Sequence, residues 1–229
     1  MTTETHNQQP KPLLTEEEVM RSLPHRQTTS STTFNLPLSY EQAYYAIFGH
    51  FAAEIRARGR KVKYDKEGAE IVAQIAKILT QDSYRFGIHL CGLCGTGKTT
   101  LIKALQQLVN KLSQQGKFPS SEEQPYIVIK SARDINAESQ DRAQFQRIRA
   151  YTILAIDDLG TEPSEVMQYG NIISPITEIL EYRYTNRLYT IISTNLTAKQ
   201  IQEKYGTRIS DRLREMMHKV VFRQPSYRA

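Results

Sequence analysis

The sequence predicts an α/β fold in which a parallel sheet has helices on both faces. From residue 86 onward, short apolar runs alternate with longer helical stretches, and a glycine-rich loop follows the first of these runs. A later apolar run, residues 153–156, ends in two aspartates. Strands and helices that alternate at this spacing are typical of a parallel sheet, because each crossover helix returns the chain so that the next strand runs in the same direction.

Residues 1–35 are expected to form a mobile polar tail. They contain one short predicted helix, from Thr15 to about Leu23, because Thr15 and Glu18 have the spacing of a capping box. The stretch QTTSSTT that follows, residues 27–33, cannot bury a core and is typical of a linker.

Two amphipathic helices are predicted next, over residues 40–58 and 65–80. Ser39 and Gln42 form a capping box for the first helix, and Gly59 stands just past its end, where a left-handed residue is favoured. Residues 36–82 are therefore expected to form a helical extension, which either packs on its own domain or docks a partner. Basic residues from Arg56 to Lys63 lie at the end of the first helix and just after it. Three explanations for them stay open: they interact with the helix dipole, they bind DNA, or they bind a partner protein.

The α/β core is predicted over residues 83–229. Its strands are expected at residues 86–90, 126–129, 151–156, 188–193 and 220–222. Its helices are expected at residues 98–112, 143–149 and 171–187, followed by two short helices that end at about residue 217.

Composition excludes several classes of protein. With 11 Gly, 9 Pro and 2 Cys, the chain is not collagen-like, of low complexity or a disulfide scaffold. No apolar run approaches the roughly 20 residues that a membrane span needs, so we expect a soluble, cytoplasmic protein with no membrane association. The net charge of +6 favours a polyanionic partner only weakly, because a solvated basic surface gives the same value.

The strongest functional signal is GLCGTGKT at residues 92–99, which matches the phosphate-binding pattern G-x-x-x-x-G-K-T. Glycines let backbone N–H groups approach phosphate oxygens, and the N-terminus of the following helix adds partial positive charge. Lys98 is expected to contact the β- and γ-phosphates of ATP, and Thr99 to bind Mg²⁺. The residues expected to bind the nucleotide are Gly92, Gly95, Thr96, Gly97, Lys98, Thr99 and Thr100.

Acidic and polar residues follow two later apolar runs. Asp157 stands at a strand end where a carboxylate can hold Mg²⁺, and Asp158 is suited to orient or deprotonate the attacking water. Asn195 is expected at the same carboxyl edge of the sheet, where open α/β folds bind ligands, although a plain turn residue is the alternative. Arg208 and Arg212 are four residues apart on a predicted helix and share a face, where local ion pairs are the alternative.

Cys91 and Cys94 have the C-x-x-C spacing of a redox pair. Because both lie within the phosphate loop, whose glycines already have a function, a redox enzyme is disfavoured. A narrower hypothesis stays open, in which a disulfide between them distorts the loop and blocks nucleotide binding. The 5 His residues are scattered and form no Cys/His cluster, which argues against a zinc site.

Together these motifs resemble those of the AAA+ ATPases of the bacterial replicative helicase-loader group, whose relatives include the ATP-binding helpers of insertion-sequence transposases. The resemblance covers about residues 85–228. It is carried by GLCGTGKTT (92–100), ILAIDDLG (153–160), IISTNLT (191–197), YGTRISDRLREM (205–216) and VVFRQPSYR (220–228). Many ATPases share the first two motifs, whereas the last two are much more specific.

The resemblance implies a P-loop fold of the AAA+ type, without the C-terminal helical lid that most AAA+ proteins have. It assigns Asn195 as the sensor of the γ-phosphate, Arg212 as the arginine finger that enters the neighbouring subunit's site, and Arg208 as its assistant. Hydrolysis of ATP to ADP and phosphate is then expected in a homo-oligomer. We expect it to be slow, because Asp158 stands where many AAA+ proteins have Glu, and to be stimulated by assembly or DNA.

The resemblance also implies macromolecular partners. DNA, mainly single-stranded, is expected to be held through its phosphates, with Arg147, Arg149, Arg183 and Arg187 as candidate contacts. A protein client, a replicative helicase or a transposase, is expected to be recruited by the N-terminal helices. Two rival functions stay open: a small-molecule kinase with the same phosphate loop, and a non-hydrolysing adaptor whose fold ATP merely orders.

Overall fold

The computed structural model describes residues 34–62, 65–119, 124–163, 166–168 and 171–223. The helix predicted from Thr15 to Leu23 and the linker at residues 27–33 lie outside the described residues. Among the helices that are described, none combines the length and the apolar character needed to cross a membrane.

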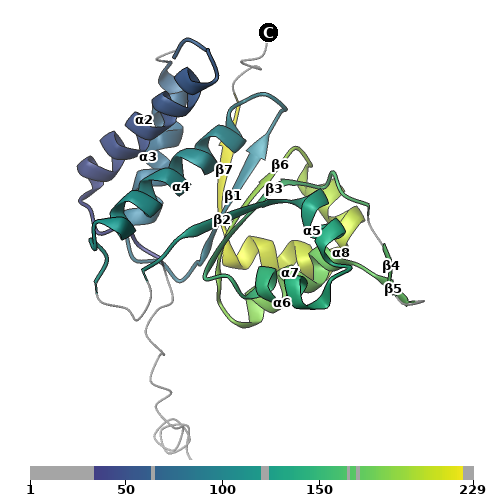
Figure 1. Cartoon of the computed structure of the whole chain (residues 1–229). Helices are drawn as coiled ribbons and strands as arrows, with labels where there is room; N and C mark the ends of the chain where they lie inside the picture. The colour runs from purple at the N-terminus through teal and green to yellow at the C-terminus, as the bar shows by residue number, and fades with distance from the viewer. Residues whose placement is uncertain (1–33, 63–64, 120–123, 164–165, 169–170, 224–229) are drawn as a thin grey trace, which may run out of the picture. The chain divides into compact units, whose positions relative to one another are not determined.

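A five-stranded sheet forms the centre of the fold (Figure 1). Its strands are β1 (Gly87–Gly92), β2 (Ile127–Ser131), β3 (Ile153–Leu159), β6 (Tyr189–Thr194) and β7 (His218–Phe222). They lie in the order β2-β3-β6-β1-β7, and every neighbouring pair is parallel. The predicted parallel sheet is therefore confirmed, and each predicted apolar run overlaps one of these strands.

Helices lie on both sides of the sheet (Figure 1). One side has α2 (Tyr40–Ala57), α3 (Lys66–Thr80) and α4 (Lys98–Gln114), and the other has α5 (Ala132–Glu138), α6 (Arg142–Ala150), α7 (Pro175–Thr185) and α8 (Ala198–Met216). The inner strands β1, β3 and β6 are largely buried between these two layers. Burial on both faces explains why their sequences are nearly continuous apolar runs and do not alternate.

The predicted helix over residues 171–187 is wrong in its first part. Residues Asn171–Ile173 form β5, which pairs with β4 (Val166–Gln168), and α7 begins only at Pro175. A proline favours the first turn of a helix, since its φ angle is already helical and it has no N–H group that would go unpaired there.

Two further helices differ from the prediction in detail. α5 was not expected; it begins with a capping box in which Ser131 and Asp134 exchange hydrogen bonds with each other's backbone. The two short helices predicted up to residue 217 are the two halves of α8, which Gly206 interrupts with non-helical angles (φ 83°, ψ 164°).

Residues 36–82 belong to the same compact unit as the α/β core, a unit that extends over residues 32–229. α2 packs against α4, and α3 packs against both α2 and β7. Leu36 and Ile47 share one hydrophobic cluster with Leu105 of α4. The expected boundary near residue 82 therefore does not separate two compact units, and client recruitment by these helices stays a prediction.

The two ends of α2 follow the signals in the sequence. Ser39 and Gln42 form the predicted capping box at its start. At its end Gly59 has a left-handed φ of 69°, and its N–H donates to the carbonyl of Arg56 over 2.8 Å. The N–H of Arg60 donates to the carbonyl of Ile55 over 3.2 Å. This pair of bonds is a Schellman motif, which fixes the direction in which the chain leaves the helix.

Candidate functional site

The phosphate loop, residues 92–97, connects the end of β1 to the start of α4. A side chain on Gly92 would come within 2.3 Å of the carbonyl oxygen of Phe222, so only glycine fits there. Gly97 has φ of 100°, and a Cβ atom on it would lie 3.4 Å from the ring of Phe51, because α2 packs directly on the loop. As the N-cap residue, Gly97 has no side chain to occupy the first N–H groups of α4, which suits an anion at this helix end.

Lys98 is buried, with 5% of its surface exposed, and its ammonium group donates three hydrogen bonds. The acceptors are the carbonyl oxygens of Gly92 and Leu93, each at 2.8 Å, and Oδ1 of Asn195 at 2.7 Å. Burial lowers the pKa of Lys98, and the carboxylate of Asp158 acts in the opposite direction. Asn195 therefore reaches the phosphate loop from the carboxyl end of β6, although its role as a sensor stays a prediction.

Thr99 and Asp157 lie beside each other on α4 and β3. The hydroxyl of Thr99 donates to Oδ1 of Asp157 over 3.0 Å, and the hydroxyl of Ser193 donates to the same oxygen. Hydroxyl and carboxylate oxygens are ligands that Mg²⁺ accepts in proteins, so this group fits the predicted magnesium site. Sequence analysis assigned Ser193 no role of its own, because only the pairing of β6 with β3 brings this residue to Asp157.

Asp158 lies in an irregularity at the end of β3. Its φ is 54°, and the register of β3 against β6 shifts between Ile156 and Leu159. Its N–H donates to the hydroxyl of Ser193 over 2.9 Å, and the residue lines the same cavity as the phosphate loop. In a regular strand two consecutive side chains point to opposite faces, and a bulge re-aims one of them. The bulge thus allows Asp157 and Asp158 to serve one site.

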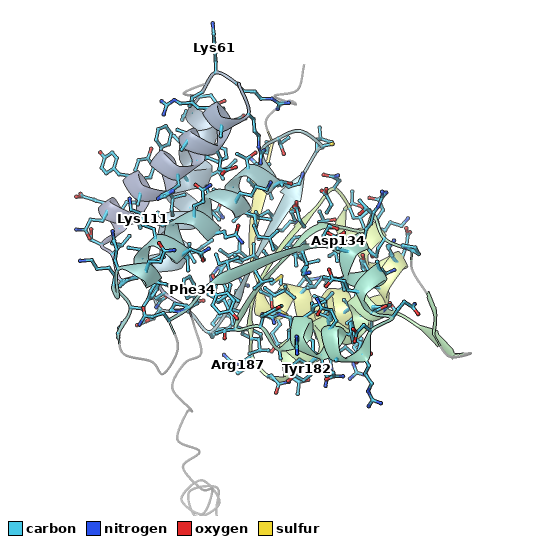
Figure 2. All side chains as sticks on the ribbon, in the orientation of Figure 1. Phe34, Lys61, Lys111, Asp134, Tyr182 and Arg187 are labelled. Atoms are coloured by element: carbon cyan, nitrogen blue, oxygen red, sulfur yellow. The ribbon has the colours of Figure 1, made fainter. Side chains whose placement is uncertain are left out.

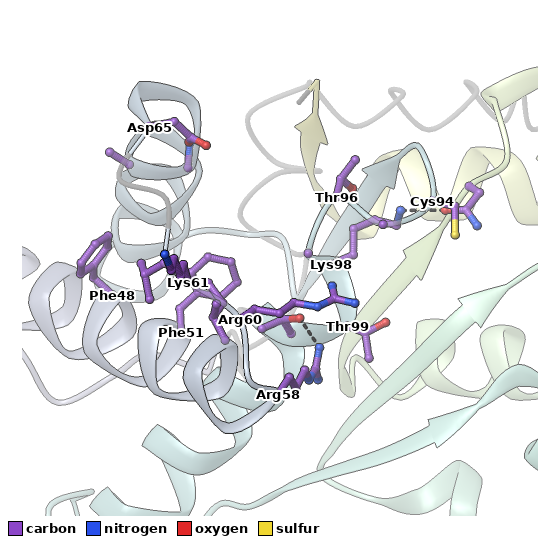
Figure 3. A pocket seen from close by; sticks show the side chains of 18 of the residues that line it. Phe48, Phe51, Arg58, Arg60, Lys61, Asp65, Cys94, Thr96, Lys98 and Thr99 are labelled. Atoms are coloured by element: carbon purple, nitrogen blue, oxygen red, sulfur yellow. Dashed lines mark hydrogen bonds between the residues drawn. The ribbon is translucent and has the colours of Figure 1, made fainter. Parts of the chain in front are cut away.

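A cavity of about 810 Å³ opens beside the phosphate loop (Figure 3). The loop, Asp158 and Asn195 form one wall, and the other wall comes from α2, the segment that follows it and the start of α3. The apolar residues of this second wall include Phe48, Phe51, Ile55, Val62 and Ala69, and its basic residues are Arg58, Arg60 and Lys61. A cavity of this size, with apolar walls and a few polar groups, suits a small molecule such as a nucleotide. The sequence did not reveal this second wall, because it left open whether residues 36–82 pack on their own domain or dock a partner.

Arg208 and Arg212 lie on one face of α8, as predicted. Nε of Arg208 and Nη1 of Arg212 pair with the same oxygen, Oε1 of Glu181 on α7, over 3.2 Å and 2.9 Å. The guanidinium of Arg212 also lies 4.8 Å from the centre of the Tyr184 ring. Neither arginine lines the cavity beside the phosphate loop of its own chain.

The prediction that Arg183 contacts DNA is wrong, because this side chain is completely buried. Arg149 forms an ion pair with Glu178 over 3.3 Å and lies over the ring of Tyr182. Arg147 and Arg187 are exposed, and Arg187 donates to the carbonyl of Tyr84 over 3.0 Å. Figure 2 shows Arg187 and Tyr182 at the lower edge of the part drawn with side chains. Of the four predicted DNA contacts, Arg147 and Arg187 are therefore the two exposed residues.

The two cysteines occupy different environments and are not joined in a disulfide. Cys91 is buried in β1, and burial raises the pKa of its thiol. Cys94 is exposed and lines the cavity beside the phosphate loop. Within the part of the chain that the structure describes, no group of three or more His, Cys, Asp or Glu side chains could hold a metal ion.

The sheet order and the phosphate loop define the class of fold, a P-loop α/β fold. The DnaC helicase loader shares this fold, with a TM-score of 0.55 and 19% sequence identity over 71% of this chain and 93% of the DnaC chain. DnaI is similar as well, with a TM-score of 0.53 and 20% identity over 72% of this chain and 87% of the DnaI chain. No protein-family model and no curated protein sequence matches the chain. The resemblance to the helicase-loader group is thus confirmed at the level of the fold.

Proposed function

We propose that the chain is an ATP-dependent molecular switch of the helicase-loader type, which binds and hydrolyses ATP in an oligomer on DNA. The convergence of the predicted residues at one edge of the sheet supports this proposal most strongly. Lys98 contacts Asn195, Thr99 contacts Asp157, and Asp158 lines the cavity beside them. These residues come from three separate segments of sequence, and their meeting gives the combination of cation, acid and amide that phosphoryl transfer uses.

In the proposed site, Lys98 exchanges its carbonyl and amide acceptors for phosphate oxygens when a nucleotide binds. The backbone N–H groups at the start of α4 contact the same phosphates. Thr99 and Asp157 would hold Mg²⁺, which would supply positive charge to neutralise the phosphate oxygens. Asp158 accepts a hydrogen bond or a proton from the attacking water, and Asn195 helps to orient it.

The proposal places Arg212 in the site of a neighbouring subunit. Arg212 and Arg208 lie outside the cavity of their own chain and are held on the surface of α7 and α8 by Glu181. An arginine in this position can stabilise the transferring phosphoryl group only after two chains assemble. Assembly is therefore part of the proposed mechanism.

A helicase is the client that the fold supports best, because both DnaC and DnaI share it and DnaC is a helicase loader. In this proposal DNA phosphates contact exposed arginines such as Arg147 and Arg187, so affinity for DNA falls steeply with salt. A transposase is the alternative client. We propose that residues 36–82 recruit the client protein. These residues belong to the same compact unit as the α/β core.

The substitution Asp158→Asn tests the proposed reaction. We expect turnover of ATP to fall by about 100-fold, the usual contribution of a general base, while ATP affinity changes by less than about twofold. Asp211→Asn is a matched control, because Asp211 is an exposed carboxylate on α8 that pairs with Arg214. Calorimetry measures the affinity, and release of phosphate measures the turnover.

The same assays separate the rival functions. Turnover that single-stranded DNA stimulates supports the DNA-associated switch, whereas transfer of phosphate to a metabolite indicates a kinase. A wild-type chain that binds ATP but never releases phosphate, with or without DNA, would be the non-hydrolysing adaptor.

A further inference from the structure

The basic segment at the end of α2 lies against the phosphate loop. Arg58 is the C-cap residue of α2, and Arg60 is the second residue beyond the cap. The Schellman motif formed by Gly59 and Arg60 fixes the backbone of this segment. The positions of both arginines relative to the loop are thus set by local backbone structure and do not depend on a flexible linker.

The guanidinium group of Arg58 is held between Glu54 on α2 and Thr100 on α4. One terminal nitrogen lies 3.5 Å from a carboxylate oxygen of Glu54, and Nη1 donates to the hydroxyl of Thr100. Glu54 in turn accepts a hydrogen bond from Gln107, so this network joins α2 to α4. Thr100 follows Thr99 in the first turn of α4. The Arg58 guanidinium therefore lies at the phosphate-binding end of that helix.

Arg60 and Lys61 line the same cavity, together with Arg58 and Lys98. Figure 3 shows the side chain of Arg60 extending from the end of α2 toward Lys98 and Thr99. The acidic residues of the lining are Asp65 and Asp158, and Asp65 caps α3 by accepting the N–H of Gly68 over 2.6 Å. Four cations against two carboxylates give a cavity with a net positive lining, as a polyphosphate ligand requires.

A favourable interaction with the dipole of α2 does not explain this arrangement. Such an interaction needs only that a cation lie near the last turn, and Arg56 meets that condition without lining the cavity. Arg58 and Arg60, by contrast, are directed toward a loop that is distant in sequence. The ring of Phe51 on α2 lies close to the loop, only 3.4 Å from where a Cβ atom on Gly97 would be.

We propose that Arg58 and Arg60 bind the phosphates of the nucleotide in the same chain, opposite Lys98. The proposal rests on the proposed function, because it needs a nucleotide in this cavity. It assigns two binding residues that the glycine-rich motif does not contain. It also makes the end of α2 a direct contact of the ligand, so that nucleotide binding stabilises the helix pair formed by α2 and α3.

The test measures affinities of the full chain for ATP, ADP and inorganic tripolyphosphate by calorimetry, in wild type and in the variants Arg58→Ala and Arg60→Ala. We expect each variant to bind all three ligands about tenfold or more weakly, the effect of losing one charged hydrogen bond. Arg60→Lys keeps the charge and is expected to lose less affinity than Arg60→Ala. Arg56→Ala is the matched control and is expected to bind within about twofold of wild type.

Three results can contradict these expectations, and they differ in meaning. If Arg58→Ala and Arg60→Ala bind ATP and tripolyphosphate as wild type does, the inference is wrong and the proposed function stands. The inference is also wrong if ATP affinity falls while tripolyphosphate affinity does not, because the arginines then act away from the phosphates. A wild-type chain that binds neither ATP nor ADP overturns the proposed function itself. Thermal unfolding without ligand checks that each variant is folded.

Discussion

Arg183 is the largest side chain that the described structure buries completely. Its guanidinium group donates to the carbonyl oxygens of Tyr151 and Tyr189 over 2.7 Å and 2.6 Å, and its Nε donates to the hydroxyl of Thr190 over 2.8 Å. Burial lowers the pKa of Arg183 to about 9, which leaves the group charged at neutral pH. These bonds tie α7 to the amino-terminal ends of β3 and β6, so the residue has a structural role.

Replacing Arg183 with Met tests that role at the scale of one residue. We expect the free energy of unfolding to fall by about 3 kcal/mol, because the buried carbonyl groups lose their donors. The control Arg147→Met removes an exposed guanidinium and is expected to change stability by less than about 0.5 kcal/mol. Urea unfolding measures both. Equal stability of the two variants would mean that water replaces the lost hydrogen bonds of Arg183.

At the scale of one element, α2 contains two glycines with opposite roles. Gly49 lies in the middle of the helix, and Gly59 follows its end with a left-handed φ of 69°. A Cβ atom on either residue would meet no atom within 4 Å, so packing does not distinguish them. Only the backbone conformation does, and alanine tolerates the helical conformation but disfavours the left-handed one.

Alanine substitutions at the two positions are therefore expected to shift stability in opposite directions. Gly49→Ala stabilises the protein by about 1 kcal/mol, since it reduces the entropy of the unfolded chain and favours the helix. Gly59→Ala destabilises it by about 1 kcal/mol and, because Arg58 and Arg60 flank it, weakens ATP binding as well. Thermal unfolding and calorimetry measure the two effects. Unchanged ATP affinity in Gly59→Ala would argue against a role of the Schellman motif in the site.

Local signals in the sequence predicted some elements well. Capping residues and helical spacing located α2, α3 and α4, and short apolar runs located all five strands of the parallel sheet. The hairpin of β4 and β5 was missed because each strand has only 3 residues, too few for a pattern to stand out. The bulge at Asp158 was missed too, because it depends on how β3 pairs with β6.

At the scale of the whole molecule, the proposed active site is divided between chains. Lys98 and Thr99 line the cavity of one chain and Thr99 donates to Asp157, whereas Arg212 pairs with Glu181 outside that cavity. A divided site makes activity depend on assembly, because neither part stabilises the phosphoryl group alone. We therefore expect hydrolysis to rise more steeply than linearly with protein concentration.

Mixing two inactive variants tests the divided site. Arg212→Ala retains its own nucleotide site but supplies no arginine, and Lys98→Ala supplies the arginine but lacks a working site. Each alone is expected to lose at least about 100-fold in turnover, whereas the mixture recovers part of the wild-type rate. Arg214→Ala, a change of an exposed arginine on the same helix, is the control and stays active. A mixture no faster than its components would exclude an arginine finger in trans.

The sequence by itself determined the class of fold, the position of the phosphate loop and the residues most suited to bind ATP and Mg²⁺. It could do so because backbone geometry and phosphate chemistry require particular residues at fixed spacings within one short segment. Only the tertiary structure decided that α2 and α3 belong to the core, that Arg183 is buried, and that Ser193 lies beside Asp157. It also brought Arg58 and Arg60 to the phosphate loop. These relations join segments far apart in the chain, and they depend on strand order and helix packing, which no local pattern of residues specifies.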